Sequence, residues 1–203
     1  PGTLTVTASE QALTIVSASD EKDYDGEALT AKTATVTYAA KAGETAWSAT
    51  AADGETVTLP TGDKLTVHVT GSATNVADTK AGNNAVTYEL ENAGFYRSVQ
   101  ATAGTLTISK REVTIQAPDD TKAYDGTALT SPAIEIADKV LASQATAAGT
   151  GSQTAVGGAQ GNNPVAVTGI EGKGYDENNY KLTLLPGTLT VTASEQALTI
   201  VSA

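Results

Sequence analysis

The first eighteen residues of the chain return unchanged as its last eighteen. Residues 1–18 read PGTLTVTASEQALTIVSA, and residues 186–203 read the same, an offset of 185 residues (186 − 1). A copy of this length does not arise by chance, so we interpret the chain as a window of a tandem array, slightly longer than one period. Arrays stack one small unit many times, which predicts repeated small domains in place of one large domain.

Each period contains two related units. The sequence KDYDGEALT at residues 22–30 returns as KAYDGTALT at residues 122–130, and GTLT at residues 2–5 returns at residues 104–107 and 187–190. Because these motifs keep the same order, they mark where each unit begins and ends. We therefore expect the final strand and linker of a preceding repeat at 1–9, repeat A at 10–109 with an insertion at 31–62, repeat B at 110–194, and the first strand of a following repeat at 195–203.

Under this division the two ends of the chain, residues 1–8 and 197–203, are strands that lack the rest of their units. Unpaired strands seek partners, so we expect these ends to be disordered or paired with a neighbouring molecule. The linkers at 7–11 and 110–111 contain neither glycine nor proline. Such linkers restrict bending and favour an elongated arrangement of the domains.

Apolar and polar residues alternate with a period of two along much of the chain, as they do at residues 65–70. Short strands of this kind between glycine-containing turns predict an all-β chain of two tandem immunoglobulin-like β-sandwich domains, with β-grasp-like modules as the alternative. We also assign residues 136–145 to a strand, because the sequence at 138–140 resembles that at 63–65, where a clear strand opens.

Composition excludes several classes of partner. The chain has no cysteine, so each domain must be held by its core, and 12 basic against 23 acidic residues give a net charge of −11. An acidic chain argues against nucleic acid as a partner, and its self-repulsion favours a soluble monomer. No apolar run approaches the roughly 18 residues that a membrane span needs. We therefore expect neither nucleic-acid binding nor membrane insertion.

Residue types for catalysis do not form a recognisable set. His68 is the single histidine, whereas a catalytic triad or a histidine-ligated metal site needs further partners. No nucleophile elbow, phosphate-binding loop or dinucleotide fingerprint is present. We therefore expect a protein that is not an enzyme and uses no cofactor, with His68 facing solvent.

The motif set resembles that of the YDG/MBG-type repeats of large bacterial surface proteins. The resemblance is carried by Lys-x-Tyr-Asp-Gly-x-Ala-Leu-Thr at 22–30 and 122–130, by Gly-Ser-x-Thr-x-Val at 71–76 and 151–156, and by the Gly-Thr-Leu-Thr motifs. It implies an exported, extracellular adhesin associated with the bacterial cell wall. It also implies that the partners are neighbouring repeats of the same chain, with host glycan or protein as a further ligand class.

Two Tyr-Asp-Gly motifs are the strongest local signal. In the interpretation that we favour, Asp-Gly supplies a tight turn and the tyrosine packs against the sandwich. Contact with a ligand is the alternative. The residues concerned are Tyr24, Asp25 and Gly26 in the first unit and Tyr124, Asp125 and Gly126 in the second.

The insertion at 31–62 contains Tyr38 and Trp47, the only tryptophan of the chain. We favour extra strands at 33–38 and 56–59 that complete a larger sandwich with Trp47 in its core. The alternative is a protruding binding face on which Tyr38 and Trp47 stack against a sugar or a peptide.

Two kinds of covalent or metal stabilisation are open from the sequence. Lys22 and Lys122 stand at matching positions, and Lys122 could form an isopeptide bond with Asn179; an exposed lysine near a turn is the favoured interpretation. The acidic segments at 119–120 and 176–179 offer oxygen ligands for calcium, but they lack the spacing of known calcium loops, so solvated loop acids are favoured.

These observations predict a non-enzymatic stalk or spacer repeat that projects a distal binding region from the cell wall. The alternative function is an adhesive module that recognises host glycan or protein weakly and gains strength from repetition. In that case the insertion in repeat A is the candidate contact face.

Overall fold

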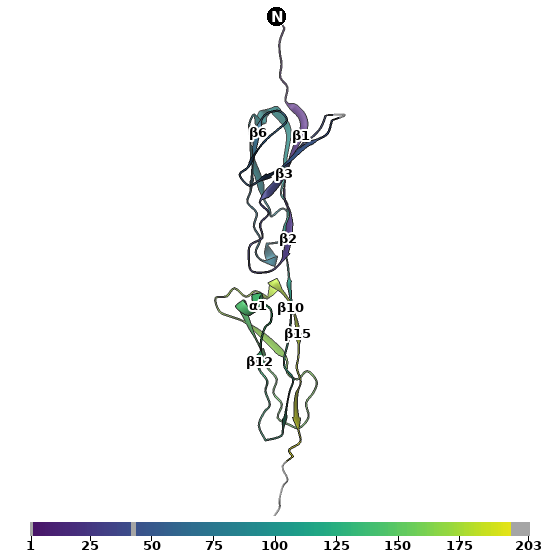
Figure 1. Ribbon diagram of the computed structural model, residues 1–203, viewed down its shortest axis with the longest axis vertical. Helices are drawn as coiled ribbons and strands as arrows, with labels where there is room; N and C mark the ends of the chain where they lie inside the picture. The colour runs from purple at the N-terminus through teal and green to yellow at the C-terminus, as the bar shows by residue number, and fades with distance from the viewer. Residues whose placement is uncertain (1, 42–43, 196–203) are drawn as a thin grey trace, which may run out of the picture. The chain divides into compact units, whose positions relative to one another are not determined.

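The computed structural model describes residues 2–41 and 44–195, and the chain divides into two compact units, Pro1–Lys110 and Arg111–Ala203 (Figure 1). β-strands are the predominant regular structure of the described residues and helices are few, which confirms the all-β class. We describe each unit by itself.

Unit 1 contains a four-stranded sheet of order β4-β3-β1-β8, a three-stranded sheet of order β5-β6-β7, and the strand pair β2-β9. Two short 3-10 helices, η1 and η2, lie in its loops. The bounds are β1 (Ser9–Ser17), β2 (Asp20–Asp23), β3 (Thr33–Tyr38), β4 (Trp47–Ala52), β5 (Thr56–Thr58), β6 (Lys64–Val69), η1 (Val76–Asp78), β7 (Val86–Leu90), η2 (Ala93–Phe95), β8 (Tyr96–Thr102) and β9 (Leu106–Ser109).

The core of unit 1 lies between its two larger sheets. Leu13 and Ile15 on β1 and Leu65 and Val67 on β6 have no exposed surface and belong to one apolar cluster. These residues are the apolar members of the alternating runs, so the period-two pattern places them on the inner faces. The two sheets therefore pack face to face, as the layers of a β-sandwich do.

Unit 2 contains a three-stranded sheet of order β12-β13-β14 and the strand pairs β10-β15 and β11-β16. A short helix, α1, and a 3-10 helix, η3, complete it. The bounds are β10 (Arg111–Gln116), β11 (Asp120–Ala123), β12 (Ala133–Ile134), α1 (Lys139–Gln144), β13 (Ala145–Gly149), β14 (Val165–Gly169), η3 (Glu177–Asn179), β15 (Tyr180–Leu185) and β16 (Leu189–Thr192).

In both units the first two strands run parallel to the last two, as one long ribbon. In unit 1 the register offset is 86 residues both at Leu13–Val99 (99 − 13) and at Asp23–Ser109 (109 − 23). In unit 2 the offset is 69 residues from the start of β10 to the end of β11 (180 − 111 and 192 − 123). Because the first and last strands point the same way, each unit is entered at one end and left at the opposite end.

The strand predicted at residues 136–145 is wrong, because Lys139–Gln144 form α1. Asp138 provides the reason: its Oδ1 accepts a hydrogen bond from the backbone N–H of Leu141 at 2.9 Å, which is the contact of a helix N-cap. Leu141 has no exposed surface and anchors the helix to the unit. The following Val-Leu-Ala-Ser-Gln sequence contains good helix formers and no glycine or proline.

The two copies of the duplicated sequence differ in the structure. Leu189 and Val191 lie on β16 and are 0% and 1% exposed, whereas their copies Leu4 and Val6 are 101% and 86% exposed, in a segment without strand structure. Ser9 already belongs to β1. The strand expected at the other end, residues 197–203, lies outside the described residues.

Candidate functional site

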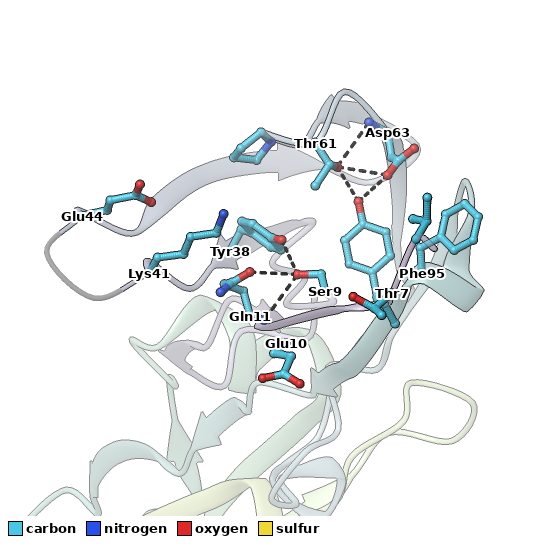
Figure 2. Close-up of a pocket in the computed structure, with 14 residues that line it drawn as sticks. Thr7, Ser9, Glu10, Gln11, Tyr38, Lys41, Glu44, Thr61, Asp63 and Phe95 are labelled. Carbon is cyan, nitrogen blue, oxygen red and sulfur yellow. Dashed lines mark hydrogen bonds between the residues drawn. The ribbon is translucent and has the colours of Figure 1, made fainter. Parts of the chain in front are cut away.

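Unit 1 has a hollow of about 640 Å³ at the end where β1 begins, which we call hollow A (Figure 2). The start of β1 supplies Ser9, the end of β3 supplies Tyr38, the turn before β6 supplies Asp63, and the start of β8 supplies Tyr96. Phe95, which precedes β8, also lines it and is 57% exposed. The pairing of β1 with β8 and with β3 brings Ser9, Tyr96 and Tyr38 to one end of the unit, and the bond from Tyr96 joins Asp63 to them.

The carboxylate of Asp63 accepts three side-chain hydrogen bonds at hollow A. Its Oδ2 accepts from the Tyr96 hydroxyl at 2.6 Å and from the Thr61 hydroxyl at 3.0 Å, and its Oδ1 accepts from the Asn92 amide at 2.8 Å. The bond from Tyr96, followed by those from Asn92 and Thr61, holds the pKa of Asp63 below its ordinary value. Burial and the bond to Asp63 raise the pKa of Tyr96 to about 12.

Tyr38 forms a second cluster beside Tyr96. Its hydroxyl lies 2.6 Å from the Ser9 hydroxyl, which donates to Oε1 of Gln11 at 3.0 Å (Figure 2). The rings of Tyr38 and Tyr96 meet edge to face with their centroids 6.2 Å apart. This arrangement fixes both rings before anything binds.

The groups that line hollow A are of the kind that make non-covalent contacts with a partner. The hollow offers aromatic rings, hydroxyls and a carboxylate that already has three donors. Within residues 2–41 and 44–195, no group of three or more His, Cys, Asp or Glu side chains lies close enough together to hold a metal ion. What these residues supply is apolar surface and hydrogen-bonding groups for a partner of matching shape.

The structure places the predicted pair Tyr38 and Trp47 opposite each other, in register on β3 and β4. Both side chains are partly buried and pack against the apolar core of unit 1. Tyr38 also lines hollow A. The insertion at 31–62 therefore contributes both to the core, through β3, β4 and β5, and to the wall of this hollow.

The two Tyr-Asp-Gly motifs form closed turns with matching contacts. Oδ1 of Asp25 accepts from Lys22 Nζ at 2.6 Å and from the Glu27 N–H at 2.9 Å. Oδ1 of Asp125 accepts from Lys122 Nζ at 2.8 Å and from the Thr127 N–H at 2.9 Å. The bonds from the lysines, followed by those from the backbone, lower the pKa of both aspartates.

The glycines of these turns have φ values of 85° at Gly26 and 84° at Gly126, a backbone region that favours glycine. The tyrosines differ in burial: Tyr24 is 3% exposed and Tyr124 is 45% exposed. In unit 2, Tyr124 lines a hollow of about 540 Å³ together with Ala123, Asp125, Ser194 and Glu195. We call it hollow B.

The structure does not bring Lys122 and Asn179 together. Lys122 lies on β11, paired with Val191, near the end of unit 2 where the chain leaves. Asn179 is buried and directly precedes the start of β15, at the opposite end of the unit. Lys122 Nζ donates to Asp125 and Thr127, and in unit 1 Lys22 Nζ donates to Asp25.

Three of the aspartates that are candidate calcium ligands each accept a hydrogen bond from a backbone N–H. Asp119 Oδ1 accepts from the N–H of Thr188 at 2.6 Å, and Asp176 Oδ1 accepts from the N–H of Asn178 at 2.9 Å. Asp120 Oδ1 accepts from the next backbone N–H at 2.8 Å. His68 lies on β6 with its side chain 40% exposed and its Nδ1 4.0 Å from Asp53.

Sequence reasoning missed the role of the paired asparagines. Asn84 and Asn163 are fully buried, and each side-chain amide donates to two backbone carbonyls: Ala18 and Ala31 in unit 1, Pro118 and Ser131 in unit 2. The preceding residues, Asn83 and Asn162, bond to both the N–H and the C=O of Leu106 and Leu189. The signal was the Gly-Asn-Asn sequence in both units at 82–84 and 161–163, which reads as a turn when each copy is taken alone.

Comparison of the chain with known protein families, with curated proteins and with solved structures gives no match. Among the residues that the structure describes, no helix is both long and apolar enough to cross a membrane.

Proposed function

We propose that the chain is a non-enzymatic spacer repeat of a bacterial surface adhesin, in which two immunoglobulin-like β-sandwich units per period extend a stalk from the cell wall. The protein works outside the cell as a monomer, and its partners are the neighbouring repeats of its own chain. The Lys-x-Tyr-Asp-Gly and Gly-Thr-Leu-Thr motifs, with their resemblance to YDG/MBG-type repeats, support the surface location.

The observation that carries the proposal is the long parallel ribbon of each unit. A unit that is entered at one end and left at the other adds its full length to an array. The ribbons span Ser9–Asp23 and Arg111–Ala123, which at roughly 3.3 Å per residue is roughly 50 Å and 40 Å. Each period of 185 residues therefore adds about 90 Å if the units follow one another in line.

Solution scattering of chains with one, two and three periods tests this function. We expect the maximum dimension to grow by about 90 Å with each added period. A dimension that grows only as the cube root of the chain length, as in a compact assembly, would contradict the spacer function.

Hollow A favours a second candidate function, an adhesive module for host glycan or protein. Phe95 is exposed at its rim and Tyr38 lines it, which is the kind of surface that stacks on a sugar ring. Glycan-array binding that is lost in Phe95→Ala, and in Trp47→Ala if the insertion is the contact face, would support this function. Absence of binding at array densities, where weak contacts are multiplied, would remove it.

A further inference from the structure

Hollow A and hollow B are lined by the same two residues of the repeat. Ser9 and Glu10 line hollow A, and Ser194 and Glu195 line hollow B. These pairs are copies of each other, separated by the period of 185 residues (194 − 9 and 195 − 10). One short stretch of the repeat therefore borders a hollow of repeat A in its first copy and a hollow of repeat B in its second.

Chain connectivity places a Tyr-Asp-Gly turn at the rim of hollow A in any array with this period. The N–H of Tyr124 donates to the C=O of Thr192 at 2.9 Å, so the turn of repeat B is tied to the end of β16. The copy of Thr192 is Thr7 (192 − 7 = 185), and Thr7 lines hollow A. A repeat B that ends at Thr7 and keeps this bond holds its turn next to a residue that lines hollow A.

We propose that hollow A is the docking surface for the Tyr-Asp-Gly turn of the preceding repeat B, and that hollows A and B are the two halves of one joint between periods. The partner is a second copy of this chain's own unit 2. The inference rests on the proposed function, because it needs an array, and it adds the residues that make contact.

The exposed aromatic side chains of the two halves fit this role. Tyr124 is 45% exposed on the turn, and Phe95 is 57% exposed at hollow A. Aromatic pairs are among the most favourable contacts that protein surfaces make. Tyr24 is 3% exposed although its turn has the same local hydrogen bonds, so this turn geometry is compatible with a buried ring.

The two aspartates at these surfaces already have partners of their own. Asp125 is held by Lys122 and by the N–H of Thr127, and Asp63 is held by Tyr96, Thr61 and Asn92. Bringing the two surfaces together therefore leaves neither aspartate unpaired, a state that would oppose docking.

Thiol labelling of a chain lengthened by one period tests the joint, because the natural sequence contains no cysteine. A single Tyr124→Cys is placed in the first or in the second period, and the rate of maleimide labelling is compared. The turn of the first period faces a following hollow A, whereas that of the second does not. We expect roughly tenfold slower labelling in the first period, the ratio for an interface whose opening costs about 1.4 kcal/mol.

Phe95→Cys must give the reciprocal pattern, and it leaves the docking tyrosine intact. Here the second period has a preceding repeat B and the first has none, so labelling is slower in the second period. Ala166→Cys is the matched control, since this exposed residue lies on β14, away from both hollows, and must label equally in both periods.

Equal rates for Tyr124→Cys and Phe95→Cys in both periods would overturn the joint. Scattering from the same lengthened chain separates this outcome from failure of the spacer function. If the maximum dimension of the chain grows by about 90 Å but the labelling rates are equal, the spacer function is supported and the joint is contradicted. If the chain is compact but the two cysteines are protected from labelling in the expected periods, the joint is supported and the spacer function is contradicted.

Discussion

The hydroxyl of Tyr96 donates to Oδ2 of Asp63 at 2.6 Å and ties the start of β8 to the turn before β6. β8 belongs to the four-stranded sheet and β6 to the three-stranded sheet, so this bond joins the two layers of unit 1 at the edge of hollow A. This bond is sensitive to alkaline pH, because only the neutral phenol of Tyr96 can donate to the carboxylate.

Tyr96→Phe should remove an alkaline loss of stability from unit 1. The folded state raises the pKa of Tyr96 from 10.0 to about 12. A raised pKa gives stability that is complete below pH 10 and is lost as the pH rises through 12. Urea unfolding followed by Trp47 fluorescence reports on unit 1 alone. The free energy of unfolding obtained in this way should fall less steeply with rising pH in the variant than in the wild type.

At neutral pH we expect Tyr96→Phe to cost about 1 kcal/mol for the lost hydrogen bond. Tyr88→Phe removes a hydroxyl from another tyrosine that packs against the same core and serves as the control. An alkaline profile of Tyr96→Phe that matches the wild type would show that the Tyr96–Asp63 bond does not set this pH dependence.

Asn163→Ala should destabilise unit 2 by about 3 kcal/mol, at about 1 kcal/mol for each of three hydrogen bonds. The side chain donates to Pro118 O at 3.0 Å and to Ser131 O at 3.1 Å, and it accepts from the N–H of Gly151 at 2.9 Å. Asn163→Asp should cost more, because a carboxylate would face two carbonyl oxygens. Urea unfolding followed by circular dichroism measures both changes.

The control for Asn163 is Asn178→Ala, a change at an exposed asparagine of the same unit. We expect its effect to stay within about 0.5 kcal/mol. If the two alanine variants unfold at the same urea concentration, the buried asparagine is not a determinant of the fold.

Much of the strand structure was predictable because alternation reports local geometry. The runs at Leu13–Ile15, Leu65–Val69 and Val113–Ile115 became buried strands, and Thr33–Tyr38 in the insertion became β3. The helix at Lys139–Gln144 was missed because Asp-Lys precedes a strand in one unit and caps a helix in the other. What distinguishes them is the partner of the aspartate: Asp138 accepts from the N–H of Leu141 as a helix cap, whereas Asp63 accepts from the Tyr96 hydroxyl.

The candidate site was less accessible to sequence reasoning. The residue type of Tyr38 indicated a site residue, but its neighbours Ser9 and Tyr96 come from segments that meet it only through the pairing of β1, β3 and β8. Asp63 comes from the other sheet and joins them through its bond from Tyr96. The ribbon that carries the spacer proposal likewise depends on the parallel pairing of distant segments, which no local pattern encodes.

Gly187→Ala should destabilise unit 2 strongly, whereas the same change in the sequence copy, Gly2→Ala, should have no effect. A Cβ at Gly187 would meet the carbonyl oxygen of Pro118 far inside van der Waals contact, while a Cβ at Gly2 would meet nothing within 4 Å. Overpacking against backbone costs about 1–3 kcal/mol or more. Thermal unfolding by calorimetry compares the two variants, and equal shifts would contradict the close approach of these segments in unit 2.

Asp138 should link the stability of unit 2 to acidic pH. It accepts from Arg111 Nε at 2.8 Å and from the N–H of Leu141 at 2.9 Å. Its partial burial favours the neutral form, but these two bonds outweigh that effect and lower its pKa. A lowered pKa gives stability that is present above the unfolded value and is lost as the pH falls through the folded value.

Two substitutions at Asp138 separate its charge from its role as a helix cap. Asp138→Asn keeps a cap acceptor and loses the ion pair, whereas Asp138→Ala loses both and should cost about 2 kcal/mol at neutral pH. In urea unfolding, the free energy of unfolding of both variants should decrease less on acidification than that of the wild type. Glu112→Gln is the control, because its ion pair with Lys181 is mostly exposed and solvent screening leaves it little effect on stability. If Asp138→Asn retains the full acid dependence, another carboxylate is responsible for it.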